Sequence, residues 1–104
     1  MDAATIREFA AEGKYEYSKH AERERQVDMM HTWELEEALR HCDIIEFYPD
    51  DARGPSCLVL GFSAHRPIHA VCTTRGNPDE LLLVTVYDPS KRPDKWKNNY
   101  RERR

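Results

Sequence analysis

The stretch that decides the fold is Ser56–Asp88, which reads SCLVLGFSAHRPIHAVCTTRGNPDELLLVTVYD. It contains three apolar runs rich in Val, Leu, Ile, Thr and Tyr, at Cys57–Phe62, Ile68–Thr73 and Leu81–Tyr87. Gly, Pro, Asn and Asp residues bound these runs, which is the pattern of β-strands separated by turns. Because the gaps between the runs are short, consecutive strands are expected to form hairpins. The stretch therefore predicts a three-stranded antiparallel meander that the rest of the chain covers or extends.

The segments on either side of the meander carry helix and strand signals. Before it, the sequence predicts helices over Asp2–Glu12, Lys19 to about Val27 and Trp33 to about Cys42, and strands at Lys14–Ser18 and Asp43–Tyr48. After it, Pro93 and the i, i+4 spacing of Trp96 and Tyr100 predict a basic C-terminal helix over Lys95–Arg104. We therefore expect an α+β fold, with helices on one face of a mainly antiparallel, curved sheet of four to five strands.

Composition limits the class of protein. The 104 residues are enough for one domain (1–104), with a core expected over about 14–96. No apolar run reaches the length of a membrane span, and the first residues lack an apolar signal region, so we expect a soluble, cytoplasmic protein. The cysteines Cys42, Cys57 and Cys72 lie far apart without a C-x-x-C pair, which predicts buried thiols rather than disulfides or a zinc knuckle. No cofactor is expected.

Charge is unevenly distributed along the chain. Residues 91–104 carry seven basic and two acidic side chains, so the other 90 residues hold a charge of −8 within a net charge of −3. A basic tail on an acidic body favours either attraction to phosphate or docking of the tail on its own domain. Lys91, Arg92, Lys95 and Lys97 are the candidate nucleic-acid contacts in this tail.

The alternation of the strands predicts one apolar and one more polar face. In the last strand, Leu82, Val84 and Val86 are expected to face the helices, together with Ile68 and Ala70 of the preceding strand. The opposite face is expected to be open to solvent, as one face of an antiparallel sheet can be. That face would present four polar side chains, namely His69, Thr73, Thr85 and Tyr87.

Several motifs in order resemble one known family. They are Y-x-Y-S-x-H-A (15–21), E-L-E-E-A-L (34–39), I-I-E-x-Y-P-D-D (44–51), C-L-V-L-G (57–61), R-P-I-H-A-V (66–71) and V-T-V-Y-x-P (84–89), followed by Trp96. Together they resemble the bacterial and archaeal family called domain of unknown function 4258, which is grouped with the RelE/ParE-like toxin superfamily. Members carry arginines at set offsets after the histidine, whereas neither Arg23 nor Arg25 falls clearly on the usual offset.

The resemblance implies a RelE/ParE-like fold and the toxin component of a toxin–antitoxin system. Genes of the family often neighbour antitoxins with a YgiT-type zinc-finger region, so such an antitoxin is the implied partner, with RNA as a further one. The biochemical activity of the family is not established. The oligomeric state does not follow from the sequence.

The first chemical hypothesis is a metal-independent RNA endonuclease. That reaction needs a base for the 2′-hydroxyl, an acid for the leaving 5′-oxygen and cations for the phosphorane charge. His20 and His69 are the candidate base and acid, Tyr87 is a proton donor or stacking group, and Arg23 or Arg25 would hold phosphate. Each residue also has a structural interpretation: strand contacts for the histidines, sheet packing for Tyr87, and a solvated helix face for the arginines.

Two alternatives remain open. The acidic body favours a non-catalytic module that binds a protein partner, because proteins that engage structured RNA are usually basic. A metal-binding domain is the second alternative, since His65 and His69 have i, i+4 spacing and Asp50 or Asp51 could share the site. Pro67 interrupts the helical geometry that would give this spacing meaning.

Overall fold

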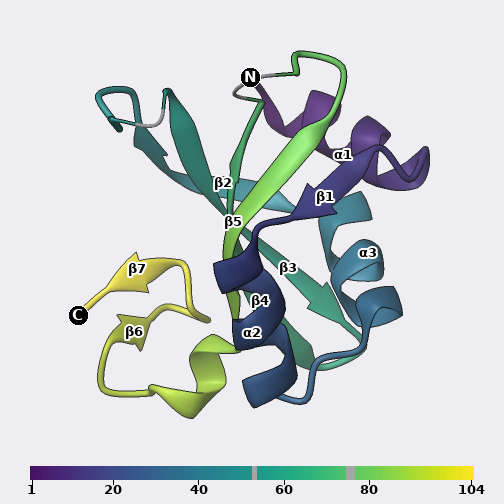
Figure 1. Cartoon of the computed structure of the whole chain (residues 1–104). Helices are drawn as coiled ribbons and strands as arrows, with labels where there is room; N and C mark the ends of the chain where they lie inside the picture. The colour runs from purple at the N-terminus through teal and green to yellow at the C-terminus, as the bar shows by residue number, and fades with distance from the viewer. Residues whose placement is uncertain (53, 75–76) are drawn as a thin grey trace.

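A computed structural model of the chain describes residues 1–52, 54–74 and 77–104. The elements follow the order α1 (Ala3–Ala11), β1 (Tyr15–Tyr17), α2 (Lys19–Val27), α3 (Thr32–Arg40), β2 (Asp43–Tyr48), β3 (Ser56–Ser63), β4 (Arg66–Thr73), β5 (Leu81–Tyr87), the 3-10 helix η1 (Pro89–Lys91), β6 (Trp96–Lys97) and β7 (Glu102–Arg103) (Figure 1). The three helices predicted before the meander and the α+β class are confirmed. No helix in the described ranges is long and apolar enough to cross a membrane.

Five strands form one sheet in the order β1-β5-β4-β3-β2. β3, β4 and β5 pair antiparallel as the predicted meander, and β2 adds antiparallel to β3. β1 pairs parallel with β5, so the sheet is mixed, and the expected mainly antiparallel arrangement does not hold at this edge. The backbone bonds Leu81 N to Lys14 O (3.0 Å) and Ser18 N to Leu83 O (2.9 Å) fix the parallel pair.

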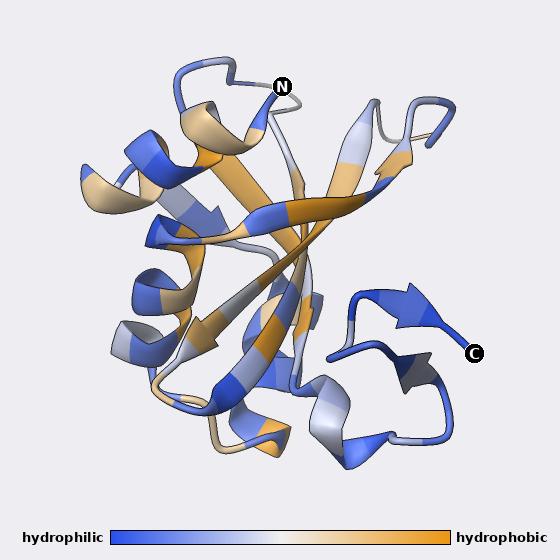
Figure 2. Cartoon of the chain, turned by 180° about the vertical axis from the view of Figure 1, so that it is seen from behind, coloured by the Kyte–Doolittle hydropathy of each residue, from blue (hydrophilic) through white to orange (hydrophobic). Residues whose placement is uncertain are grey.

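The hydrophobic core lies between the sheet and the helices. Figure 2 shows α1 and α3 on one side of the sheet, with the apolar side of α3 turned toward the strands. Gly61 of β3 allows this close approach, because a Cβ there would lie 2.1 Å from the Ala38 carbonyl oxygen of α3. The core also contains Ile6 and Ala10 of α1, which precede the expected core range of 14–96.

A bulge changes which residues of β5 face the helices. The register shifts between the pairs Val71–Thr85 and Cys72–Leu83, which leaves one extra residue in β5. Leu81, Leu83 and Val86 therefore lie in the core, whereas the sequence alternation assigned Leu82 and Val84 to that face. Beyond the bulge the expected alternation holds, and Tyr87 pairs with His69 on the opposite face.

The C-terminal segment forms a hairpin rather than the expected helix. β6 and β7 pair antiparallel, and Asn98, Asn99 and Tyr100 between them have φ values of 51°, 57° and 69°. Asn tolerates this left-handed conformation better than most residues, so Asn98-Asn99 favours a turn over a helix. The hairpin lies on the side of the sheet opposite α1 and α3 (Figure 2). It therefore covers part of the face that the sequence predicted to be open.

Candidate active site

Helix α2 is held against β5 by its N-terminal cap. The Ser18 hydroxyl accepts a hydrogen bond from Ala21 N and donates one to Val84 O, both at 2.9 Å. Ala21 is buried in the core, which turns the other side of the helix outward. The residues at i, i+3, i+4 and i+7 from His20 share one side of the helix: His20, Arg23, Glu24 and Val27.

This side of the helix forms one wall of a hollow of about 250 Å³. Strand β5 contributes Tyr87, and the segment after η1 contributes Arg92. The complete lining is His20, Arg23, Glu24, Val27, Asp28, Tyr87 and Arg92. The structure therefore brings together three of the five predicted catalytic residues, His20, Arg23 and Tyr87.

Glu24 is the residue of this site that the sequence analysis missed. Its Oε1 lies 3.2 Å from His20 Nε2 and also accepts a hydrogen bond from Val86 N at 3.1 Å. The Glu24 side chain is 26% exposed and that of His20 is 60% exposed, so a partly buried carboxylate holds a solvent-accessible imidazole. The i, i+4 spacing of His20 and Glu24 on a predicted helix was the available signal.

His69 does not lie on an open face, contrary to the sequence-based expectation. It is fully buried beneath the C-terminal hairpin, with the Trp96 ring centroid 4.4 Å away. Its Nε2 lies 2.9 Å from the Tyr100 carbonyl oxygen, which can only accept, so Nε2 carries the proton. Its Nδ1 therefore accepts from the Tyr87 hydroxyl at 3.1 Å. His69 is a positioning residue for Tyr87 and not a solvent-facing acid or base.

Burial shifts the pKa values of His69 and Tyr87 in the directions that preserve the hydrogen bond between them. It lowers the pKa of His69 to about 4, with the Tyr100 carbonyl opposing the shift only in part. Burial also raises the pKa of Tyr87 to about 12. Near neutral pH the imidazole is neutral and the phenol is protonated, so Tyr87 enters the hollow with its proton in place.

Arg25 points away from the hollow and has a structural role. Its guanidinium pairs with Glu22, donates from Nη1 to Met30 O at 2.8 Å and lies 5.9 Å from the centre of the Tyr17 ring. These contacts tie α2 to the connector before α3 and to β1. The hypothesis that Arg25 holds phosphate is therefore not supported, and Arg23 is the arginine of α2 that lines the hollow.

The four basic candidates of the C-terminal segment divide into two pairs. Lys91 Nζ lies 3.8 Å from Asp28 Oδ1, and Lys97 Nζ lies 3.9 Å from Glu102 Oε2, so both are ion-paired. Arg92 and Lys95 have no acidic partner among the described residues. Of the four, only these two carry uncompensated charge.

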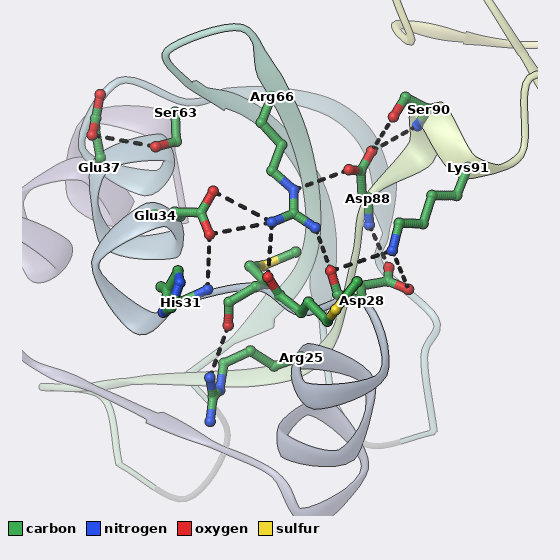
Figure 3. Close-up of polar contacts among 12 residues, drawn as sticks. Arg25, Asp28, His31, Glu34, Glu37, Ser63, Arg66, Asp88, Ser90 and Lys91 are labelled. Atoms are coloured by element: carbon green, nitrogen blue, oxygen red, sulfur yellow. Dashed lines mark hydrogen bonds and ion pairs between the residues drawn. The ribbon is translucent and has the colours of Figure 1, made fainter.

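A network around Arg66 joins several elements beside Asp28, one of the residues that line the hollow (Figure 3). The Arg66 guanidinium, at the start of β4, donates to Asp88 Oδ2 (3.0 Å), Glu34 Oε1 (3.2 Å), Met29 O (3.1 Å) and the Asp28 carbonyl oxygen. Asp88 in turn caps η1 through Ser90 N at 2.9 Å, and Asp88 N donates to Asp28 Oδ2 at 2.8 Å. The network thus joins the end of α2, the start of α3 and the segment that carries Arg92.

The structure gives the metal alternative no assembled ligand set. Within residues 1–52, 54–74 and 77–104, no group of three or more His, Cys, Asp or Glu side chains is arranged to hold a metal ion. His65 is an exposed residue of the turn between β3 and β4, whereas His69 is buried. All three cysteines are buried and free, as predicted, and burial raises the pKa of Cys57 to about 11.

The fold and the site define a small α+β protein in which a His–Glu pair on a helix and unpaired cations share one hollow. The chain belongs to the family described as Domain of unknown function (DUF4258), whose model matches residues 17–88. The match covers α2 to β5 and ends before η1, so Arg92 and the hairpin lie outside it. No curated protein and no solved structure matches the chain.

Proposed function

We propose that this protein is a toxin-like RNA endonuclease of the RelE/ParE type that acts without a metal ion. The proposal depends on one observation: His20 and Arg23 of α2 line the same hollow as Tyr87 of β5. Arg92 of the C-terminal segment also lines this hollow. A base, a proton-bearing phenol and two cations are the groups that cleavage of a phosphodiester by its own 2′-hydroxyl requires. The resemblance of the sequence motifs to toxin-like proteins supports the same class.

In the proposed first step, His20 acts as the general base. Its Nε2–H donates to Glu24, so Nδ1 is free to take the proton of the RNA 2′-hydroxyl as that oxygen attacks the adjacent phosphorus. Glu24 orients the ring and offsets the positive charge that it gains. Arg23 and Arg92 stabilise the negative charge of the phosphorane through charge-assisted hydrogen bonds.

In the same reaction, the bond from phosphorus to the 5′-oxygen breaks and that oxygen needs a proton. Tyr87 supplies it when its O–H turns from His69 Nδ1 toward the substrate. The products are a 2′,3′-cyclic phosphate and a 5′-hydroxyl, and no electron transfer or co-reactant is involved. His20 then returns its proton to solvent, and Tyr87 regains one.

The proposed partner is an antitoxin with a YgiT-type zinc-finger region, encoded beside this gene. The test is induced expression in bacteria, with and without the neighbouring gene, of the wild type, His20→Ala and His65→Ala. His65 is an exposed histidine outside the hollow and is the matched control. We expect growth arrest from the wild type and His65→Ala, relief by the neighbouring gene, and no arrest from His20→Ala. Arrest by His20→Ala at equal protein level would contradict the catalytic proposal.

A non-catalytic protein-binding module is the second candidate, and one observation favours it. Phe47 is 66% exposed on β2, a strand at the edge of the sheet. Exposed edges with an apolar side chain are common docking sites for extended peptides. Phe47→Glu would then abolish capture of the neighbouring gene product without affecting RNA cleavage, whereas unchanged capture would remove this candidate.

A further inference from the structure

A second hollow lies beside the first, on the other side of Tyr87. It measures about 260 Å³ and is lined by Glu24, Thr85, Tyr87, Arg92, Lys95, Trp96 and Arg103. Three of these residues, Glu24, Tyr87 and Arg92, also line the first hollow. The two hollows are therefore neighbouring parts of one groove between α2, β5 and the C-terminal segment.

The second hollow carries uncompensated positive charge. Arg103 is neutralised, because its Nε lies 2.8 Å from Glu46 Oε2 and its guanidinium packs 4.8 Å from the Trp96 ring centre. Arg92 and Lys95 have no acidic partner in the part of the chain that the structure describes. The single acid of the lining is Glu24, whose charge offsets one of these two cations and leaves the other uncompensated. In a chain of net charge −3, this groove is a local cationic site.

The cations of the second hollow stand on an ordered segment rather than on a loose tail. Asp88 caps η1 and is bound by Arg66, and Lys91 is paired with Asp28. Further along, Trp96 is buried against His69, and Arg104 Nε donates to Pro93 O at 2.9 Å. Arg92 and Lys95 are thus presented from a backbone anchored on both sides, which favours binding at a defined position.

We propose that the second hollow is a subsite for the phosphate that neighbours the cleaved one, so that the substrate is an RNA strand with at least two consecutive phosphates. The inference rests on the proposed nuclease function to say which of the two phosphates is cleaved. Binding of a phosphate in the second hollow does not itself require cleavage. Lys95 belongs to the second hollow alone, and Arg92 serves both. The family match at residues 17–88 includes Glu24, Thr85 and Tyr87 of this lining, whereas Arg92 and Lys95 follow it.

The test measures binding of dinucleotides that cannot be cleaved. The probes are fluorescently labelled 2′-O-methyl UpU, with one phosphate, and the same molecule with an added terminal phosphate at the 5′ or the 3′ end. We expect one of the added phosphates to raise the affinity of the wild type about threefold to tenfold, with a steeper dependence on salt. Lys95→Ala removes that gain and leaves binding of the unphosphorylated dinucleotide unchanged. Lys97→Ala, which removes an ion-paired lysine of the same hairpin, keeps the gain.

The outcomes separate this inference from the proposed function. A gain that persists in Lys95→Ala, or an equal loss for all three probes, would overturn the subsite while leaving the nuclease proposal standing. A wild type that binds the probes as expected but cleaves no RNA would overturn the nuclease proposal while the subsite stands. Both variants should remain folded because neither side chain is buried, and thermal unfolding checks this.

Discussion

Replacement of Arg66 by alanine tests whether its network joins β4, the end of α2, the start of α3 and η1 into one unit. The Arg66 side chain is 21% exposed, and its partners Asp88 and Glu34 are 7% and 13% exposed. Removing one partner of a buried ion pair costs about 3–5 kcal/mol. Asp88 keeps its bonds from Ser90, and Glu34 Oε1 keeps its bond from His31 N at 2.9 Å, so neither carboxylate is left without a donor. We therefore expect a loss of about 2–4 kcal/mol in the free energy of unfolding.

Urea and thermal unfolding measure this loss directly. At about 4–8 °C per kcal/mol for a domain of this size, Tm should fall by about 10–30 °C. Arg66→Lys should recover only part of the loss, because an ammonium group cannot reproduce the planar fork. Arg40→Ala is the control, since Arg40 is exposed and has no ion pair in the described ranges; it should change stability by less than about 0.5 kcal/mol. An Arg66→Ala protein as stable as the control would refute the view that this network joins the four elements.

Further predictions concern the core and the buried groups. The folded-state pKa of His69 lies near 4, below the ordinary 6.5, so its contribution to stability is present above pH 6.5 and is lost as pH falls toward 4. Between pH 7 and pH 5 the loss should amount to about 2 kcal/mol and should be missing from His69→Gln, as followed by urea unfolding at the two pH values. Gly61→Ala should lower the free energy of unfolding by more than about 2 kcal/mol, because the new methyl group meets the Ala38 backbone. Gly13→Ala should lower it by about 1 kcal/mol, because nothing lies within 4 Å of the new methyl group and only the positive φ is unfavourable. Native protein should not react with a thiol reagent, and unfolded protein should expose three thiols; rapid native labelling would mean that the core opens readily.

Local patterns were sufficient to predict most of the elements. The helix at Lys19–Val27 and the meander depend on spacing and turn residues close in the sequence, and both were predictable. The parallel pairing of β1 was not, because a three-residue strand contains no signal for its partner. The bulge in β5 also left no mark, since Leu82, Leu83 and Val84 are equally suited to the core.

The site was predictable only where it depends on one helix face and one strand end. His20 and Arg23 share one helix face, which their spacing predicts, whereas their meeting with Tyr87 depends on the packing of α2 along β5. The burial of His69 depends on the conformation of the C-terminal segment. The spacing of Trp96 and Tyr100 was compatible with a helix that would have left this face of the sheet open. Asn98-Asn99 was the local signal for the hairpin that covers His69 instead. Glu24 could not be singled out because a charge-dense helix is compatible with either a solvated surface or a polar site.

The central claim is that His20 acts as the general base in RNA cleavage. Single-turnover cleavage of RNA by purified protein in the presence of a chelator tests this claim most directly. The account predicts 2′,3′-cyclic phosphate and 5′-hydroxyl products, a rate lower by about 100-fold or more in His20→Ala, and a wild-type rate in His65→Ala. Glu24→Gln should fall between them, because the imidazole remains but loses its orienting carboxylate. Cleavage by His20→Ala at the rate of the wild type, or the absence of cleavage by folded wild-type protein, would contradict the account.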